Sequence, residues 1–297
     1  MIDLAGRVAI VTGAGAGLGR EHALLLARRG ARVVVNDIAQ AAAQAVADEI
    51  AAAGGVACAA AASVTDFDAV RAMVDDAVTR WGRVDILVNN AGILRDKSFA
   101  KMDLADFRLV MDVHLMGSVH CTKAVWDGMR ARGYGRIVMT TSSSGLYGNF
   151  GQSNYGAAKM ALVGLMQTLA LEGARHGIRV NCIAPTAATR MLDGLLPQRE
   201  LELLHPAHVS PAVLVLVGED APTRTILCAG AGSFEAAHIT LTPGVFVGSG
   251  PDAAEAVLAS WPRIVGRQGS FVPEAGERQG RLELQNAGYT RAAKGEG

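Results

Sequence analysis

A glycine cluster between an apolar run and a helical segment constrains the fold more than any other feature. Residues 7–12 are mostly apolar and lead into Thr12-Gly-Ala-Gly-Ala-Gly-Leu-Gly19, and a helical pattern covers residues 17–30. Glycine permits positive φ and a close approach of the backbone to a phosphate. The free N–H groups at the start of the next helix attract an anion. The alternative is a plain strand–helix turn, but the position favours a dinucleotide site. The predicted cofactor contacts here are Gly13, Gly15, Gly17, Leu18 and Gly19.

Apolar runs alternate with helical segments as far as about residue 185. The predicted strands are 7–12, 32–36, 56–60, 83–88, 136–141, 179–183 and a short last one at 225–228. The predicted helices are 17–30, 38–53, 66–81, 104–132 and 153–176. The strands are continuously apolar, which is typical of a parallel sheet covered on both faces. We therefore predict an α/β fold, a doubly wound parallel sheet of the Rossmann type with helices on both faces.

Beyond the last predicted helix–strand pair, the pattern weakens. We predict one domain over residues 1–272, with a substrate loop near 186–208, and a polar, mobile tail over 273–297. The loop carries four apolar residues that are either a lid over an apolar substrate or core packing: Met191, Leu192, Leu195 and Leu196.

The charge balance argues against nucleic acid as a partner. Lysine and arginine together number 28, as do aspartate and glutamate, so the formal net charge is zero. The four cysteines lie in apolar runs without metal-ligand spacing, which predicts no metal site and suits a reducing compartment. The first residues lack a signal-peptide pattern, and no apolar run reaches the roughly 20 residues of a membrane span. We therefore expect a cytoplasmic protein without a membrane partner.

Asp37 indicates the choice of cofactor. It ends the second predicted strand, eighteen residues after Gly19, and no arginine or lysine lies between Val33 and Gln40. A carboxylate at this place accepts hydrogen bonds from the adenosine ribose and repels a 2′-phosphate. Asp37 is also suited to cap the next helix, and the two roles are compatible. The sequence thus predicts NAD rather than NADP.

Three polar residues form a candidate catalytic group. Tyr155 and Lys159 are four apart in a predicted helix and share one face, and Ser142 ends the preceding strand. A free tyrosine has a pKa of about 10, and a nearby ammonium together with the positive nicotinamide ring favours the phenolate. Tyr155 would then move the proton while the hydride passes between nicotinamide and substrate carbon. A Tyr-x-x-x-Lys spacing alone is weak evidence, so the conjunction with the glycine turn carries the argument.

Taken together, these motifs resemble those of the short-chain dehydrogenase/reductase superfamily over residues 1 to about 230. The matching positions are Thr12, Gly13, Gly17 and Gly19 of the turn, Asn89-Asn-Ala-Gly92, and Ser142 thirteen residues before Tyr155. The resemblance implies that NAD is also contacted by Val64, Asn90, Ala91, Gly92, Tyr155, Lys159 and Pro185. The sequence departs from the superfamily pattern at Ser63, where many members have an aspartate, and at Thr186, where a glycine is usual.

A narrower resemblance is to the (3R)-hydroxyacyl-CoA dehydrogenase domain of peroxisomal multifunctional enzyme type two and its bacterial single-domain relatives. It rests on residues 89–99, 134–142, 145–152 and 183–191. It implies a 3-hydroxyacyl-CoA substrate, including bulky or steroid-derived acyl groups. Arg95 or Lys97 could meet a CoA phosphate, although a solvated loop is the favoured interpretation.

His114 stands where the superfamily has an asparagine that holds a water linked to the lysine. The same replacement is found in the multifunctional-enzyme branch. An imidazole could hold that water and titrate near a pH of about 6.5. The alternative is a histidine that only packs and bonds within the fold. We include His114 with Ser142, Tyr155 and Lys159 as a candidate catalytic residue.

Two other functions compete with an acyl-CoA dehydrogenase. One is an NAD-dependent dehydrogenase of a free steroid, ketone or other small secondary alcohol. The other is a catalytically silent NAD-binding module, which the intact Ser142, Tyr155 and Lys159 disfavour. In the resembling family the helices corresponding to 104–132 and 153–176 pair across a twofold axis. We therefore expect a homodimer or homotetramer.

Overall fold

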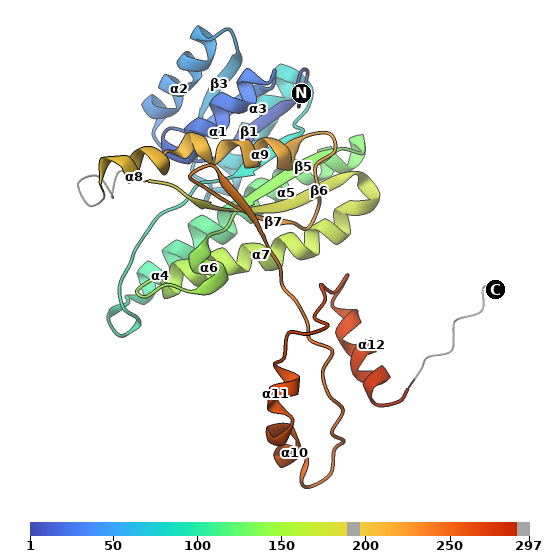
Figure 1. The fold of residues 1–297 in the computed structure, drawn as a ribbon. Helices are drawn as coiled ribbons and strands as arrows, with labels where there is room; N and C mark the ends of the chain where they lie inside the picture. The colour runs from blue at the N-terminus through green and yellow to red at the C-terminus, as the bar shows by residue number, and fades with distance from the viewer. Residues whose placement is uncertain (189–196, 290–297) are drawn as a thin grey trace, which may run out of the picture. The chain divides into compact units, whose positions relative to one another are not determined.

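The computed structural model describes residues 1–188 and 197–289. The chain forms two compact units, Met1–Ala237 and His238–Gly297 (Figure 1). One domain over residues 1–272 with a mobile tail over 273–297 stays a prediction; the helix α12 (Glu277–Asn286) lies within the range predicted as the tail.

The first unit is built on one eight-stranded sheet of order β3-β2-β1-β4-β5-β6-β7-β8. All neighbouring strands pair in parallel except β7 and β8, which are antiparallel. The strands are β1 (Val8–Val11), β2 (Arg32–Asp37), β3 (Val56–Ala61), β4 (Ile86–Asn89), β5 (Gly135–Thr140), β6 (Ile178–Thr186), β7 (Ile226–Gly230) and β8 (Ser233–Ala237). The predicted doubly wound fold is confirmed. Strand β8 was not predicted, because its exposed residues lack the buried apolar pattern of the others.

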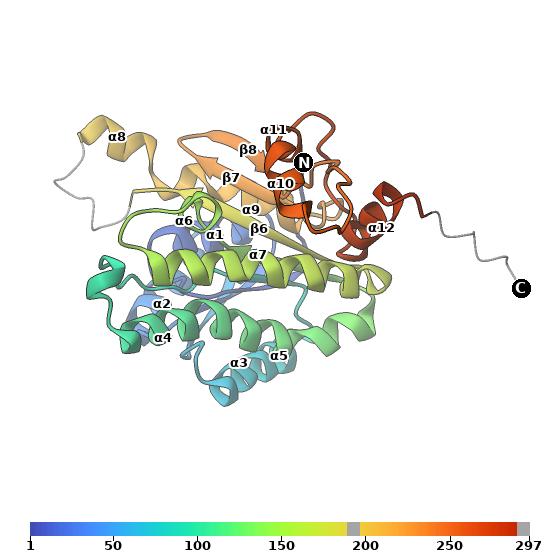
Figure 2. The same cartoon turned by 90° about the horizontal axis from the view of Figure 1, so that it is seen from below.

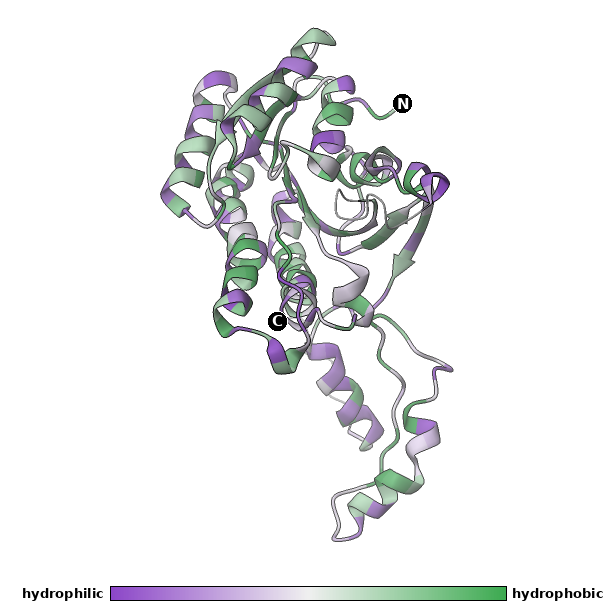
Figure 3. Ribbon diagram, turned by 90° about the vertical axis from the view of Figure 1, so that its left-hand side faces the viewer, coloured by the Kyte–Doolittle hydropathy of each residue, from purple (hydrophilic) through white to green (hydrophobic). Residues whose placement is uncertain are grey.

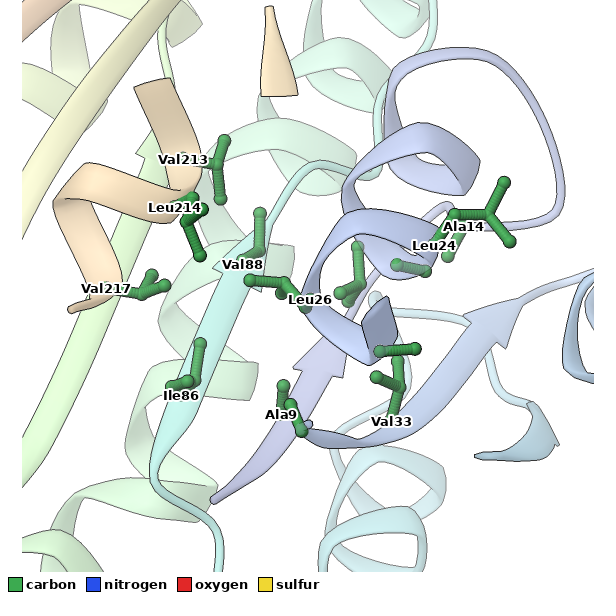
Figure 4. Packing of buried hydrophobic residues seen from close by; sticks show 14 of the residues in the cluster. Ala9, Ala14, Leu24, Leu26, Val33, Ile86, Val88, Val213, Leu214 and Val217 are labelled. Carbon is green, nitrogen blue, oxygen red and sulfur yellow. The ribbon is translucent and has the colours of Figure 1, made fainter. Parts of the chain in front are cut away.

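Helices cover both faces of this sheet. On one face lie α1 (Gly17–Arg28), α2 (Gln40–Ala52) and α9 (Ser210–Val217). On the other lie α3 (Phe67–Trp81), α5 (Gly117–Arg132) and α7 (Ser153–Gly173), seen from below in Figure 2. Successive residues of one strand serve opposite faces. Ala9 of β1 belongs to the cluster in Figure 4, whereas Ile10 packs with the other cluster. In Figure 3 the strands are accordingly mostly green (hydrophobic), and purple, hydrophilic residues occur along the helices.

The long helix predicted over 104–132 contains a change of winding. It consists of α4 (Leu104–Met111), a π-helical turn (Asp112–Met116) and α5. A π-helical turn adds a residue to the helix and is frequent at functional sites. Here the inserted turn contains His114, which is 2% exposed.

A short helix that was not predicted, α6 (Ser143–Tyr147), packs closely against α7. A Cβ on Gly145 would lie 2.8 Å from Lys159 Cβ, and one on Gly156 would lie 3.0 Å from the Ser144 carbonyl oxygen. Two glycines therefore permit a contact that brings the end of β5 next to Tyr155. Gly156 serves this internal contact, whereas Gly164 faces open space and remains available for a contact between subunits.

The stretch Gln198–Val217 contains α8 (Gln198–Leu203), the 3₁₀ turn Pro206–His208 and α9. By length and composition it is the one candidate membrane span among the described residues. Its apolar second half has a structural explanation, because α9 packs against α1 and β5 and most of its residues are buried.

The second unit contains α10 (Ala253–Ala259), α11 (Trp261–Ile264) and α12. Leu241 and Phe271 form an antiparallel bridge, and Asn286 of α12 donates a hydrogen bond of 2.9 Å to the Pro243 carbonyl oxygen. These contacts join segments of the second unit to one another. No residue of its three helices is buried.

Candidate active site

The predicted site residues lie where parallel strands end. Thr12 follows β1, Asp37 ends β2, Asn90 follows β4 and Ser142 follows β5. The carboxyl ends of parallel strands meet at one edge of a sheet, and the strand order reverses between β1 and β4. Ligands of doubly wound folds bind in the crevice at such a reversal. The topology thus brings together residues that are far apart in the sequence.

The glycine turn leaves no room for side chains on its inner side. A Cβ on Gly13 would lie 2.8 Å from Ala91 Cα, and one on Gly19 would lie 2.3 Å from the Gly13 carbonyl oxygen. Gly17, by contrast, has a φ of +54° and nothing within 4 Å of its Cβ position. The turn therefore packs tightly on the strand side and is open where α1 begins, which is the shape that a pyrophosphate requires.

The start of α1 fits an anion. Its N-cap is Ala16, no side chain accepts a hydrogen bond from the first N–H groups, and no acidic residue lies in the first turn. Helices normally satisfy these groups with a side-chain cap, so the uncapped end of α1 suits a phosphate. Leu18, the other residue predicted here, lies half-buried in this first turn.

Asn90 and Thr12 hold the turn in place. Asn90 Nδ2 donates to the carbonyl oxygens of Thr12 and Gly13 at 3.0 and 3.1 Å. Thr12 Oγ1 accepts from the N–H groups of Asn90 and Ala91 at 3.0 and 3.1 Å. The Asn-Asn-Ala-Gly motif thus supports the cradle, and it leads into Gly92, which lies against His114.

Asp37 lies directly beside the glycine turn. Its Oδ2 accepts from Gly15 N–H at 3.1 Å, and its Oδ1 accepts from Ala39 N–H at 3.0 Å at the start of α2. A Cβ on Gly15 would lie 2.8 Å from Asp37 Oδ2, so glycine is needed at this contact. Asp37 therefore stands beside the cradle, but it does not cap α2, because Ala39 is the N-cap residue of that helix and no side chain caps it.

Val64 and Ile38 lie just beyond the carboxyl ends of β3 and β2. Val64 follows β3, is buried, and has its carbonyl oxygen 2.9 Å from His120 Nδ1. Ile38 was not singled out in the sequence, yet it is 78% exposed beside Asp37. An isolated exposed isoleucine next to a polar ligand site could have drawn attention to it. Pro185 lies in β6, paired with Ala229 of β7.

Ser142, Tyr155 and Lys159 converge at the end of β5. Ser142 caps α6, with its Oγ accepting from Ser144 N–H at 3.2 Å, and its hydroxyl lies close enough to the Tyr155 phenol to lower the pKa of that phenol. Lys159 is 3% exposed, its Nζ lies 5.4 Å from the centre of the Tyr155 ring, and it donates to the Thr140 carbonyl oxygen at 2.6 Å. Burial lowers the pKa of Lys159 to about 7. Lys159 can therefore release and take up a proton near neutral pH.

The pKa of Tyr155 is raised in the protein without cofactor, whereas the predicted lowering also counted the charge of the nicotinamide ring. Burial raises the pKa of Tyr155, the Ser142 hydrogen bond opposes this, and the Asp96 charge raises it further. Burial disfavours the charged phenolate more than the hydrogen bond favours it. The predicted phenolate requires the nicotinamide charge together with that of Lys159, so it stays a prediction for the complex with NAD.

His114 is neutral in this site. Burial lowers its pKa to about 3, the Lys159 charge lowers it further, and the bond to the Ile93 backbone opposes both. Its Nε2 lies 2.8 Å from the Ile93 carbonyl oxygen, and its ring meets that of Tyr155 edge-on at 5.2 Å. Its Nδ1 is buried and has no hydrogen-bond partner among the described residues. The lowered pKa argues against titration of His114 near neutral pH, and its ring lies against that of Tyr155.

The two basic residues of the loop after Gly92 are engaged. Lys97 Nζ lies 3.2 Å and Arg95 Nε 3.8 Å from the carboxylate of Asp106, and both cations are about half exposed. Asp96 lies between them in the sequence, so Asp96 and Asp106 together balance the charge of the two cations. The lid residues expected at Met191, Leu192, Leu195 and Leu196 lie outside the described residues. Over residues 1–188 and 197–289, no cluster of His, Cys, Asp and Glu is arranged to hold a metal ion.

A dinucleotide cradle facing a Ser–Tyr–Lys group defines a nucleotide-dependent oxidoreductase. The family model described as short chain dehydrogenase matches residues 7–199. The chain belongs to the short-chain dehydrogenase family.

Several relatives are similar to this chain. Peroxisomal multifunctional enzyme type 2 of Drosophila melanogaster is 54% identical over 72% of this chain, but over only 37% of its own length. A putative short-chain type dehydrogenase/reductase of Mycobacterium tuberculosis is 44% identical over 90% of this chain and 96% of its own length.

Two solved structures are also similar. The full-length Drosophila multifunctional enzyme matches with a TM-score of 0.82 and 40% identity over 97% of this chain and 50% of that chain. A 7α-hydroxysteroid dehydrogenase complexed with NADH and 7-oxo glycochenodeoxycholic acid matches with a TM-score of 0.72 and 35% identity, over 78% of this chain and 95% of that chain. This chain therefore spans only part of the multifunctional enzymes that it resembles.

Proposed function

We propose that this chain is an NAD-dependent dehydrogenase that interconverts a 3-hydroxyacyl-CoA and a 3-oxoacyl-CoA, including substrates with a bulky or steroid-derived acyl group. The observation that carries the oxidoreductase chemistry is the contact of Tyr155 with Ser142 and Lys159 at the edge of the cradle. The substrate class rests on the similarity to the multifunctional enzymes, which covers 72% of this chain at 54% identity for the Drosophila enzyme.

Each catalytic side chain has a separate task. Ser142 would donate a hydrogen bond to the substrate oxygen, since its Oγ is held by Ser144 N–H and its hydroxyl lies close to the Tyr155 phenol. Tyr155 would transfer the proton between that oxygen and the protein. Lys159, buried and close to the phenol, would stabilise the phenolate while protonated. Bound NAD would supply the hydride acceptor, held by Gly13, Gly17 and Asp37.

His114 would complete the proton path without changing its own charge. Its unpaired Nδ1 is a buried polar atom, and such atoms are usually satisfied by ordered water. A water bound there would hydrogen-bond to His114, whose ring lies against that of Tyr155. We therefore place His114 in the site as a neutral partner for water rather than as an acid or base.

A second candidate is a dehydrogenase of a free steroid or ketone. It is favoured by the similarity to a hydroxysteroid dehydrogenase that covers nearly all of that protein. Arg95 and Lys97 are about half exposed and could pair with a phosphate of CoA, which favours the acyl-CoA instead.

An NADH-linked assay separates these functions. We expect 3-oxoacyl-CoAs to be reduced with a kcat/KM about tenfold or more above that of the matching free ketones and ketosteroids, equal to about 1.4 kcal/mol of added binding. Tyr155→Phe should abolish turnover while NADH still binds, because only the proton carrier is lost. Preferential reduction of ketosteroids would select the second candidate. Turnover by Tyr155→Phe within about tenfold of the parent would contradict the role of Tyr155.

A further inference from the structure

The loop that follows Gly92 is anchored to the catalytic helix at several points. The Lys97 N–H donates to the Gly151 carbonyl oxygen at 2.9 Å, and buried Asn154 donates from Nδ2 to the Arg95 carbonyl oxygen at 2.9 Å. The side chain of Asp96 is held as well, because its Oδ2 accepts from Gln152 Nε2 at 2.7 Å. A half-exposed loop is thus fixed by three bonds to the residues just before Tyr155.

Gln152 joins three segments with one side chain. Its Oε1 accepts from Ser144 Oγ at 2.7 Å and from Asn149 Nδ2 at 3.0 Å, while its Nε2 donates to Asp96. An amide suits this arrangement because it offers both an acceptor and a donor. The partners belong to α6, to the turn before α7 and to the loop after the Asn-Asn-Ala-Gly motif.

These connections lead directly to two catalytic residues. Gln152 is the N-cap residue of α7 and lies three positions before Tyr155. Its partner Ser144 donates its N–H to Ser142 Oγ at 3.2 Å, and α6 has little freedom because Gly145 lies against Lys159. Movement of the Gln152 side chain would therefore displace the Ser142 hydroxyl relative to the Tyr155 phenol.

We propose that Gln152, bonded to Asp96 and Ser144, is a positioning residue that sets the alignment of Ser142 with Tyr155. It acts through other side chains rather than on the reacting atoms. As a role in catalysis, this inference rests on the proposed dehydrogenase function.

The charges around Tyr155 support this arrangement. Asp96 is close enough for its charge to raise the pKa of Tyr155, and the Ser142 bond lowers that pKa. The other titratable groups that face the phenol are Lys159 and neutral His114. Arg95 and Lys97 are paired with Asp106. An additional carboxylate next to Asp96 would therefore raise the Tyr155 pKa again, through its charge and through loss of the Ser142 contact.

The test first places a second carboxylate at the Gln152–Asp96 bond and then exchanges the amide and the carboxylate between the two positions. Gln152→Glu sets two carboxylates against each other, and we expect kcat at about pH 8 to fall about tenfold or more, with partial recovery as the pH falls and the pair takes up a proton. The double variant Gln152→Glu with Asp96→Asn carries the same total charge as the parent. It rebuilds the bond in reverse, because the new amide at position 96 donates to the new carboxylate at position 152. It should restore kcat to within about threefold of the parent.

A second measurement does not depend on the substrate. Ultraviolet titration of tyrosinate, taken as the difference between each variant and the same variant with Tyr155→Phe, gives the Tyr155 pKa directly. We expect this pKa to rise in Gln152→Glu and to return in the double variant. The proposal would be overturned if Gln152→Glu kept the kcat and the Tyr155 pKa of the parent. It would also be overturned if the double variant recovered neither kcat nor the Tyr155 pKa relative to Gln152→Glu. If the parent reduces no 3-oxoacyl-CoA, the proposed substrate fails, and the titration still decides the positioning role.

Discussion

The two most buried histidines should make this protein sensitive to mild acid. Burial lowers the pKa of both His22 and His114 to about 3, from the ordinary value of 6.5. In the unfolded chain each binds a proton as the pH falls through 6.5, while in the folded protein each stays neutral down to about 3. The unfolded state therefore gains protons first, and the stability present above about 6.5 declines as the pH falls.

The magnitude follows from these two values. Lowering the pH from about 7 to about 5 costs about 2 kcal/mol of unfolding free energy for each histidine, since only the unfolded state is protonated in this range. His114→Asn should thus flatten the pH dependence of stability by about 2 kcal/mol over that interval, and His22→Gln should do the same. The comparison is between the changes in unfolding free energy from one pH to the other in variant and parent. A destabilisation by the substitution that is the same at both pH values therefore cancels.

The assay is urea unfolding followed by tryptophan fluorescence at both pH values, combined with the pH profile of kcat. His22 lies between α1 and α9, with its Nδ1 2.8 Å from Ser210 Oγ, and is remote from the catalytic residues, so its variant is the matched control. Neither variant should remove an apparent pKa near about 6.5 from the kcat profile. A group that titrates there in the parent and disappears only in His114→Asn would refute the neutral histidine and establish a proton-relay role.

Two further predictions concern the cofactor and the assembly. The carboxylate of Asp37 beside Gly15 should make kcat/KM for NAD(H) about tenfold or more higher than for NADP(H), and Asp37→Asn should narrow that ratio; equal use of the two cofactors by the parent would contradict the assignment. One face of α7 exposes Met160, Gly164 and Leu171, so light scattering should show a homodimer or homotetramer, and Gly164→Arg should dissociate it. A stable monomer of the parent at micromolar concentration would exclude this interface.

Much of the fold could be predicted from local pattern. Continuous apolar runs such as that at Val8–Val11 indicate strands buried on both faces, and the glycine turn before α1 has a local stereochemical cause. That Tyr155 and Lys159 share one helix face follows from their spacing of four residues and the helical period alone. Strand β8 was not predicted because an exposed edge strand carries no apolar pattern. The division into two compact units at residue 237 was not predicted because it reflects contacts rather than composition.

The sequence by itself determined which residue types are available: the glycines of the cradle, the carboxylate of Asp37 and the hydroxyls of Ser142 and Tyr155. Only the tertiary structure decided their electrostatic state and their partners. Burial, which no spacing reveals, makes His114 neutral and lowers the pKa of Lys159 to about 7. The bond from Gln152 to Asp96 joins residues 56 positions apart. Such contacts depend on how the loops pack at the strand ends, because hydrogen bonds between distant segments form only when the whole sheet has assembled.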